Sequence, residues 1–188
     1  MKKVKFRQMK EATTDDYALL ESVVVSNSAN IAGIIMAMLR RQSSMISGYQ
    51  VDQLEHSLQC ATRAERDGAD EETVVCALLH DIAVGFAPYN HASVAAEILK
   101  PYVSPANCWM IEHHGIFQHY YFGELLGLDK NERDQFNGHI YFDKTEQFCE
   151  LWDQASFDPD YDTLPLEYFE PKVHSIFGRK AWSADRYR

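Results

Sequence analysis

Residues 76–91 read CALLHDIAVGFAPYNH, and this stretch decides how the chain is interpreted. An apolar run leads directly into His80 and Asp81, and a further histidine follows at His91. Burying an imidazole beside a carboxylate is costly unless something compensates both groups. Metal ions do so, because neutral imidazole and carboxylate are their natural ligands. The stretch therefore predicts a buried metal site.

Composition restricts the class of protein. A chain of 188 residues predicts one domain with a substantial core. The net charge of −10 argues against a nucleic-acid partner, since the only basic run is MKKVKFRQMK at residues 1–10. The longest apolar run, residues 31–39, is too short to span a bilayer, so no membrane segment is expected. The four cysteines form no CxxC pair and predict a cytoplasmic protein with reduced thiols. The oligomeric state stays open.

Helical periodicity runs through the chain, and no sustained apolar/polar alternation predicts a strand. We therefore expect an all-α fold. Asp70 is the expected N-cap of a helix over residues 71–83, and Ser104 followed by Pro105 starts another. A first helix is expected to start at Asp15 or Asp16, and two further helices are expected around 129–136 and 142–154. We expect an N-terminal helical segment and loop over residues 1–50, a core domain over 51–155, and a C-terminal extension over 156–188 that packs on the core.

Histidines are the second signal. The chain has eight, and several lie in apolar context on expected helices. One such histidine is usually a hydrogen-bonded core residue, but several in one small helical domain beside Asp81 favour a metal site. His80 and Asp81 are adjacent, so on a helix they point about 100° apart, and we expect the carboxylate to bridge two ions. Periodicity does not choose between His113 and His114, because both lie on apolar faces.

The order of these residues resembles that of the HD-domain metalloproteins. His56 in QLEHSLQCA, the pair in LLHDIA, later helical histidines and Asp153 in LWDQ follow the pattern H…HD…H…H…D. The segments QLEHSLQCA, GAD and ALLHD are most similar to the HD-domain di-iron oxygenases, a family that includes inositol- and phosphonate-cleaving enzymes. The resemblance covers about residues 51–155. It implies an HD-domain helical bundle around a dinuclear metal site.

The resemblance also implies which residues bind metal. The family's IEGH segment aligns with IEHH at residues 111–114, which selects the second histidine of the pair. The implied cofactor is a mixed-valent Fe(II)/Fe(III) pair with O2 as co-substrate, although residue types alone would also suit manganese or zinc. Asp81 is the implied catalytic bridge. The implied ligands are His56, His80, Asp81 and Asp153 for the first iron, with His91 and His114 completing the second.

The implied substrate is a small phosphonate. The phosphonate-cleaving relative has a glutamate at the substrate's amine where this chain has Tyr49. An aromatic ring there favours a quaternary ammonium. The pattern resembles that of a relative that cleaves (R)-1-hydroxy-2-(trimethylammonio)ethylphosphonate to glycine betaine and phosphate, so the resemblance implies this reaction. The expected substrate-binding residues are Tyr49, Gln118, His119, Arg133, His139 and Glu150.

Two alternatives use the same ligands. A metal-dependent HD phosphohydrolase would act on a nucleotide or another phosphate ester without O2. A binding or regulatory HD module would use the metal only to hold the fold or to sense a ligand. Oxygen consumption and turnover distinguish the three.

Overall fold

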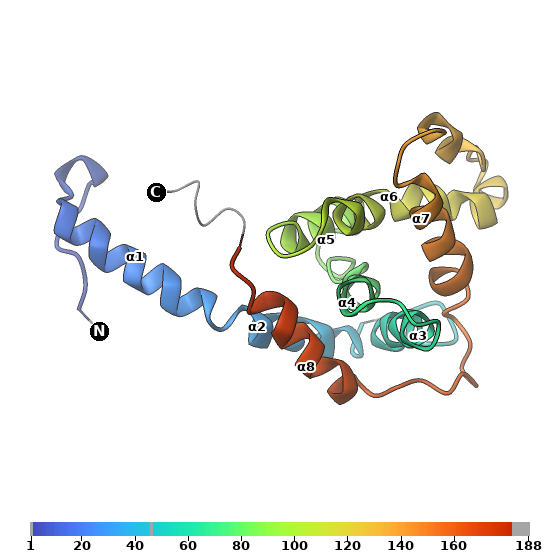
Figure 1. Ribbon diagram of the computed structural model, residues 1–188, viewed down its shortest axis with the longest axis horizontal. Helices are drawn as coiled ribbons and strands as arrows, with labels where there is room; N and C mark the ends of the chain where they lie inside the picture. Colours follow the sequence, from blue (N-terminus) through green and yellow to red (C-terminus); the bar gives the residue numbers. More distant parts are fainter. Residues whose placement is uncertain (1, 46, 182–188) are drawn as a thin grey trace.

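The computed structural model describes residues 2–45 and 47–181, and this part of the chain contains no β-strand. The prediction of an all-α fold is therefore confirmed (Figure 1). The shorter elements are the 3-10 helices η1 (Met9–Glu11), η2 (Gly123–Leu126) and η3 (Glu132–Phe136) and a π-helical turn, η4 (Cys149–Asp153). The α-helices are α1 (Thr14–Ser28), α2 (Ile31–Gln42), α3 (Gln53–Arg66), α4 (Glu71–Leu79), α5 (His91–Leu99), α6 (Pro105–Phe122), α7 (Phe142–Phe148) and α8 (Leu166–Phe177).

Side-chain caps set several helix starts. The side chain of Asp70 accepts a hydrogen bond from the Thr73 backbone N–H at 2.8 Å, as the sequence predicts. Ser104 caps α6, and Pro105 occupies the first turn, also as predicted. The first helix starts one or two residues earlier than expected, because Thr13 forms a capping box with Asp16.

Helix α4 lies at the centre of the fold. It packs against α3, α6 and α8, so residues 73–79 are buried on every side. This position explains why the stretch before the His80–Asp81 pair is apolar without interruption. The helix that leads into the pair is thereby held from several directions.

Some boundaries differ from the expected ones. Helix α4 ends at Leu79, and residues 80–86 form turns instead of extending the helix to residue 83. The helix expected around 129–136 is the 3-10 helix η3. The helix expected over 142–154 is divided into α7 and the π-turn η4, which places Asp153 at the end of a turn wider than an α-helical one.

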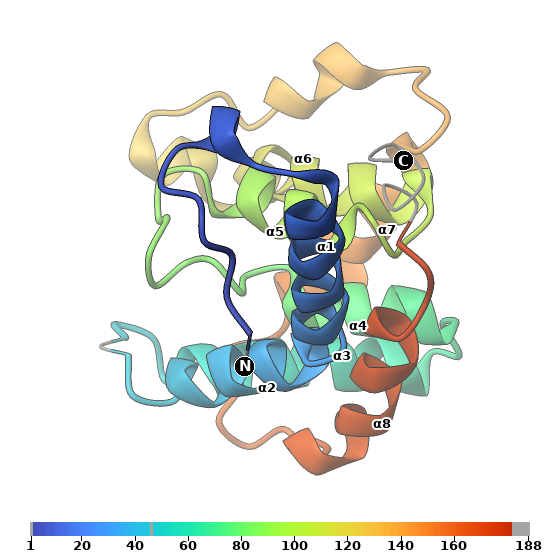
Figure 2. The ribbon, with the colours of Figure 1, turned by 90° about the vertical axis from the view of Figure 1, so that its left-hand side faces the viewer.

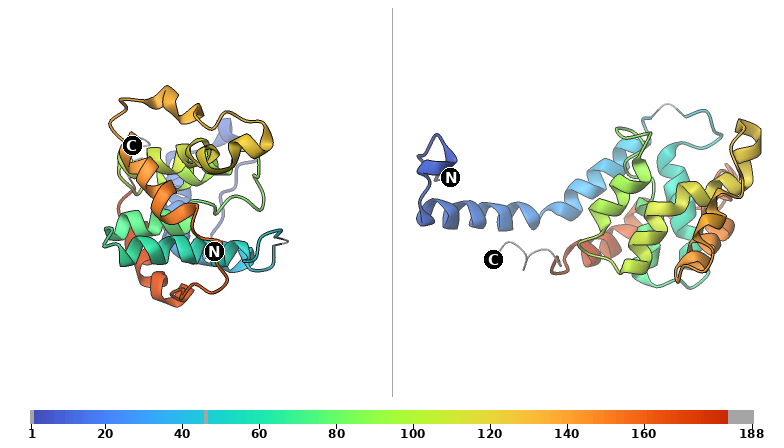
Figure 3. Two further views of the ribbon diagram at one scale, coloured as in Figure 1. Left: turned by 90° about the vertical axis from the view of Figure 1, so that its right-hand side faces the viewer. Right: turned by 90° about the horizontal axis from the view of Figure 1, so that it is seen from above.

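The two ends of the chain are arranged differently. Helix α8 packs on α2 and α4 through the buried residues Leu166, Phe169, Val173, Ile176 and Phe177. Helix α1 instead projects from the body as an arm, with the N-terminal segment at its far end (Figures 1 and 3). Figure 2 views the molecule from the side of this arm.

Within the described residues no single helix has the length and apolarity to cross a membrane. Helices α1 and α2 together meet that test only as a pair bent by 46°.

Candidate metal centre

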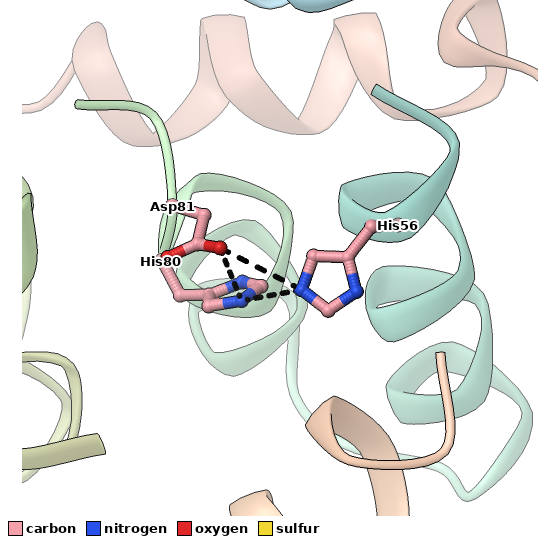
Figure 4. A group of neighbouring side chains, drawn as sticks. All are labelled: His56, His80 and Asp81. Carbon is pink, nitrogen blue, oxygen red and sulfur yellow. Dashed lines mark hydrogen bonds and ion pairs between the residues drawn. The ribbon is translucent and has the colours of Figure 1, made fainter. Parts of the chain in front are cut away.

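Six side chains from different elements meet at the inner end of α4. In three overlapping groups, nitrogen and carboxylate oxygen atoms lie within 4.8 Å of one another. Figure 4 shows one group, which joins α3 to the end of α4. The six are His56 on α3, His80 at the C-cap of α4, Asp81 in the following turn, His91 at the start of α5, His114 on α6 and Asp153 at the end of η4. These are the residues that the resemblance selected; their metal-binding role stays a prediction.

The first group surrounds the space between His56 and His80. Their Nε2 atoms are 3.0 Å apart. Asp153 Oδ1 lies 3.4 Å from each of these nitrogens. Asp81 Oδ2 lies 3.7 Å from the Nε2 atom of His56 and 3.6 Å from that of His80. Two imidazoles and two carboxylates thus face one another.

The second group uses the other oxygen of the same aspartate. Asp81 Oδ1 lies 3.2 Å from His91 Nε2 and 3.4 Å from His114 Nε2. Asp81 therefore directs one carboxylate oxygen at each group, which is the position of a bridging ligand. Asp81 and His80 also share the first group, contrary to the expectation that adjacent residues on a helix diverge. That expectation was wrong because α4 ends before the pair.

The tautomer of each cluster histidine is indicated by the hydrogen bond that its Nδ1 atom makes. A backbone carbonyl oxygen only accepts hydrogen bonds, so the Nδ1 atom that faces it carries the hydrogen. All four cluster histidines make such a bond, so in the neutral ring each Nε2 has a lone pair directed at the cluster. The four acceptors are the carbonyls of Ser156 for His56 (2.9 Å), Ala77 for His80 (2.8 Å), Pro88 for His91 (3.2 Å) and Ile111 for His114 (2.7 Å).

These contacts fit metal ions. Two lone pairs 3.0 Å apart, on His56 and His80, repel each other unless a positive charge lies between them. Asp81 Oδ1 and Asp153 Oδ2 are buried without a hydrogen-bond partner among the described residues. Ligand atoms about 2.1 Å from one ion lie about 3.0–3.4 Å from each other, close to the separations in both groups. The donor set therefore suits a dinuclear centre of borderline metals.

The pKa values of the cluster residues also favour bound cations. Burial opposes ionisation of Asp81 and Asp153, yet the neighbouring histidines, His80 foremost, hold the pKa of both carboxyl groups below the usual range. Burial likewise opposes the charged form of His56, but the neighbouring Asp153 carboxylate raises the pKa of His56. Burial lowers the pKa of His91, which favours the neutral form that binds metal. The cluster therefore holds two carboxylates that require positive charge beside them.

Two glutamines support Asp81, and the sequence analysis missed both. Gln53 Nε2 donates to Asp81 Oδ2 at 2.9 Å, and Gln42 Nε2 donates to the Asp81 backbone carbonyl at 2.9 Å. Gln53 precedes His56 by three residues, so helical spacing alone predicts that the two share a face. Gln42 lies far away in sequence, and no local pattern identifies it.

An aromatic pair lies beside the first group. Phe157 stacks on the His56 ring with centroids 4.5 Å apart, and Tyr49 packs on Phe157 at 4.6 Å. Tyr49 is 68% exposed, so the pair forms an accessible aromatic surface one ring away from a cluster ligand. Tyr49 was expected near the substrate, whereas Phe157 was missed because it lies in the C-terminal extension.

The other expected substrate residues have contacts of their own. His119 pairs with Glu132 at 2.8 Å. Arg133 pairs with a glutamate at 3.1 Å and lies over a tyrosine ring at 3.8 Å, and His139 stacks on a tryptophan at 4.2 Å. None of these contacts involves a cluster residue. Gln118 follows His114 by one turn of α6, and Glu150 is exposed three residues before Asp153.

The adjacent histidines of α6 have different environments. His114 is 3% exposed and reaches the cluster. The ring of His113 stacks on Trp109 with centroids 4.1 Å apart, and its Nδ1 donates to the Trp109 carbonyl at 2.9 Å. His113 is in none of the three groups that bring the cluster together. The structure thus separates the two residues that periodicity alone left equivalent.

Residues 54–139 match the family model of the HD domain. The match includes five of the six cluster residues and ends before Asp153. It supports membership of the HD-domain superfamily, and the all-helical fold agrees with it. No curated protein matches the chain. An HD domain that carries a His/Asp cluster supports a metal-dependent enzyme of the HD type.

Proposed function

We propose that this protein is an O2-dependent di-iron oxygenase that cleaves the carbon–phosphorus bond of a 1-hydroxy-2-ammonioethylphosphonate. The observation that carries the proposal is the position of Asp81, whose two carboxylate oxygens face different groups of histidines. In a mononuclear HD enzyme, His91 and His114 would have no second metal ion to bind. The order of the six residues and the QLEHSLQCA context add support through the family resemblance.

The two groups differ in the number of protein ligands. Four side chains lie around the first position. Three, Asp81, His91 and His114, lie around the second, and His114 also lies within 4.8 Å of ligand atoms of His80 and Asp153. A bound iron pair would supply the redox chemistry that activates O2, and the second position would have more sites free for substrate oxygens. The His91 side chain is 26% exposed, which suits entry of substrate from that side. Two metal ions outweigh two carboxylates, so the centre would attract an anionic phosphonate despite the acidic chain.

The aromatic surface supports a quaternary ammonium on the substrate. A trimethylammonium group donates no hydrogen bonds and is attracted to aromatic faces. Tyr49 and Phe157 offer such faces beside His56. The proposed substrate is (R)-1-hydroxy-2-(trimethylammonio)ethylphosphonate, and the products are glycine betaine and phosphate. One O2 per substrate supplies both oxygen atoms that the products gain, so the overall reaction needs no external reductant.

The second candidate is a metal-dependent phosphohydrolase, which the HD-domain match itself favours because hydrolysis is a common activity of this superfamily. Such an enzyme would use the same six residues on a nucleotide or another phosphate ester. It would release phosphate without consuming O2. The oxygen requirement therefore separates the two functions.

The test is to measure phosphate release and O2 uptake by iron-loaded protein with the trimethylated phosphonate, in air and under argon. The proposal predicts equal amounts of phosphate formed and O2 consumed in air, and no phosphate under argon. Absence of O2 uptake with any hydroxyphosphonate, or anaerobic release of phosphate from esters, would overturn it. Replacing Tyr49 by leucine should raise KM for the trimethylated substrate about 2–5-fold. The matched control is Tyr89→Leu, because Tyr89 is fully exposed.

A further inference from the structure

Helix α1 buries none of its residues against the rest of the described chain. Seven of its fifteen residues are apolar, and at 100° per residue they point to all sides of the helix. Val24 and Val25 are 62% and 65% exposed, and Tyr17 is 48% exposed. A helix that is apolar all round is normally buried. The seven apolar residues are Tyr17, Ala18, Leu19, Leu20, Val23, Val24 and Val25.

The segment before α1 carries a charge opposite to that of the rest of the chain. Residues 1–11 contain five basic residues and one acidic residue, a net charge of +4, so residues 12–188 carry −14 of the total of −10. This basic tip lies at the end of α1 that is farthest from the body (Figures 1 and 3). It therefore lies far from the acidic surface of the body of its own chain. An acidic surface on a second copy can receive it.

We propose that α1 is a dimerisation arm that packs antiparallel against α1 of a second copy of this chain. Antiparallel pairing is self-complementary, as a two-fold interface requires. Since α1 is about 22 Å long, pairing along its length brings the basic tip of one copy to the base of the other arm. Exposed apolar residues lie at both places, Met9 at the tip and Ile34 on α2 at the base.

A membrane surface fits these observations less well. Helices that lie on membranes have one apolar and one polar face, whereas the apolar residues of α1 surround it. Asp15, Asp16 and Glu21 also lie on the helix and would meet anionic lipid unfavourably. The charge that complements the tip is on this protein itself. A second copy is therefore the occupant that the sequence and the fold favour.

The experiment is to measure the mass of the full chain by light scattering and its self-association by sedimentation. The proposal predicts a dimer of twice 21.6 kDa. The double variant Leu20→Glu, Val24→Glu should be a monomer, because it places charges in the apolar interface. The matched control Leu125→Glu, Ile140→Glu changes two residues that are 86% and 82% exposed on the body, and it should stay dimeric.

A separate variant tests the contribution of the basic tip to dimerisation. Changing Lys2, Lys3 and Lys5 to glutamate should raise the dissociation constant of the dimer roughly tenfold or more at low salt, with a smaller difference at high salt. Circular dichroism and metal content should match the wild type in every variant. A wild-type monomer at all concentrations, or a dimer that survives Leu20→Glu, Val24→Glu, would overturn the proposal. So would a monomer that binds phosphatidylserine vesicles through α1.

Discussion

The imidazoles of His56 and His80 face each other with their Nε2 atoms 3.0 Å apart, and in the neutral rings, whose Nδ1 atoms donate to backbone carbonyls, neither Nε2 carries a hydrogen. Asp153 Oδ1 lies 3.4 Å from both nitrogens. Such a pair is stable only with a cation or a proton between the rings. The fold therefore favours a positive charge between His56, His80 and Asp153. The predictions on metal binding depend on this property.

Removal of metal should destabilise the protein. A metal that binds the folded chain at a hundred times its dissociation constant contributes about 2.7 kcal/mol to the free energy of unfolding, and loss of two ions should remove at least this amount. Differential scanning calorimetry before and after chelation measures the change, and added metal should restore the transition. An unchanged melting temperature in protein shown to have lost its metal would contradict the account.

The two adjacent histidines of α6 should behave differently. His114→Ala removes a cluster nitrogen and should reduce the bound metal by about one ion per chain, because the second group then keeps only Asp81 and His91. His113→Ala is the matched control: it removes a ring that stacks on Trp109, and it should leave the metal content unchanged. Elemental analysis of the two purified variants provides the measurement. Equal metal loss in both variants would show that the choice of His114 is wrong.

Gln53 should act through Asp81. Its Nε2 atom donates to the carboxylate at 2.9 Å, and loss of such an outer contact typically weakens metal binding about 10–100-fold. Gln53→Leu should therefore lower metal affinity in a competition titration with a chelator while the fold is retained. Gln135→Leu is the control, since Gln135 is exposed on η3. Equal affinity in the two variants would mean that Gln53 does not orient Asp81.

Glu72 should make stability depend on pH. Burial would raise the pKa of its carboxyl, but hydrogen bonds from the Ser104 backbone, Arg179 and Asn107 outweigh burial and lower the pKa from 4.5 to about 2. A lowered pKa stabilises the folded state above the unfolded value. This contribution should thus be complete above pH 4.5 and should decline as the pH falls towards about 2.

The matching variant is Glu72→Gln in metal-free protein. At neutral pH it should lower the free energy of unfolding by about 1–2 kcal/mol, a value reduced for partial exposure to solvent. In denaturant titrations the difference from the wild type should shrink with acidification. Glu167→Gln, at an exposed position on α8, should change stability little at any pH. A constant difference for Glu72→Gln across this range would exclude ionisation as its cause.

Much of the fold follows from local chemistry in the sequence. Asp70 and Ser104 cap helices where the sequence predicts them, because a capping side chain binds backbone groups within its own first turn. The end of α4 at Leu79 and the π-turn before Asp153 depend on packing between distant elements, which periodicity does not record. The same holds for Phe157, whose place beside His56 is set by the path of the chain after η4.

In the candidate site, too, the sequence predicts some residues and not others. The order of histidines and aspartates, read through the family resemblance, selected six residues that the structure brings together. Among the residues expected at the substrate, His119, Arg133 and His139 were selected by neighbourhood in the sequence, and they make their contacts elsewhere. Metal ligands have a recognisable order because each needs a particular atom. Substrate contacts have no such order.

The most direct test is the anomalous scattering of iron in crystals of the iron-loaded protein. The account predicts two peaks, one among His56, His80 and Asp153 and the other beside His91 and His114, with the carboxylate of Asp81 between them. A single peak beside His56 and His80, or no peak at either position, would contradict the dinuclear centre on which the proposed function rests.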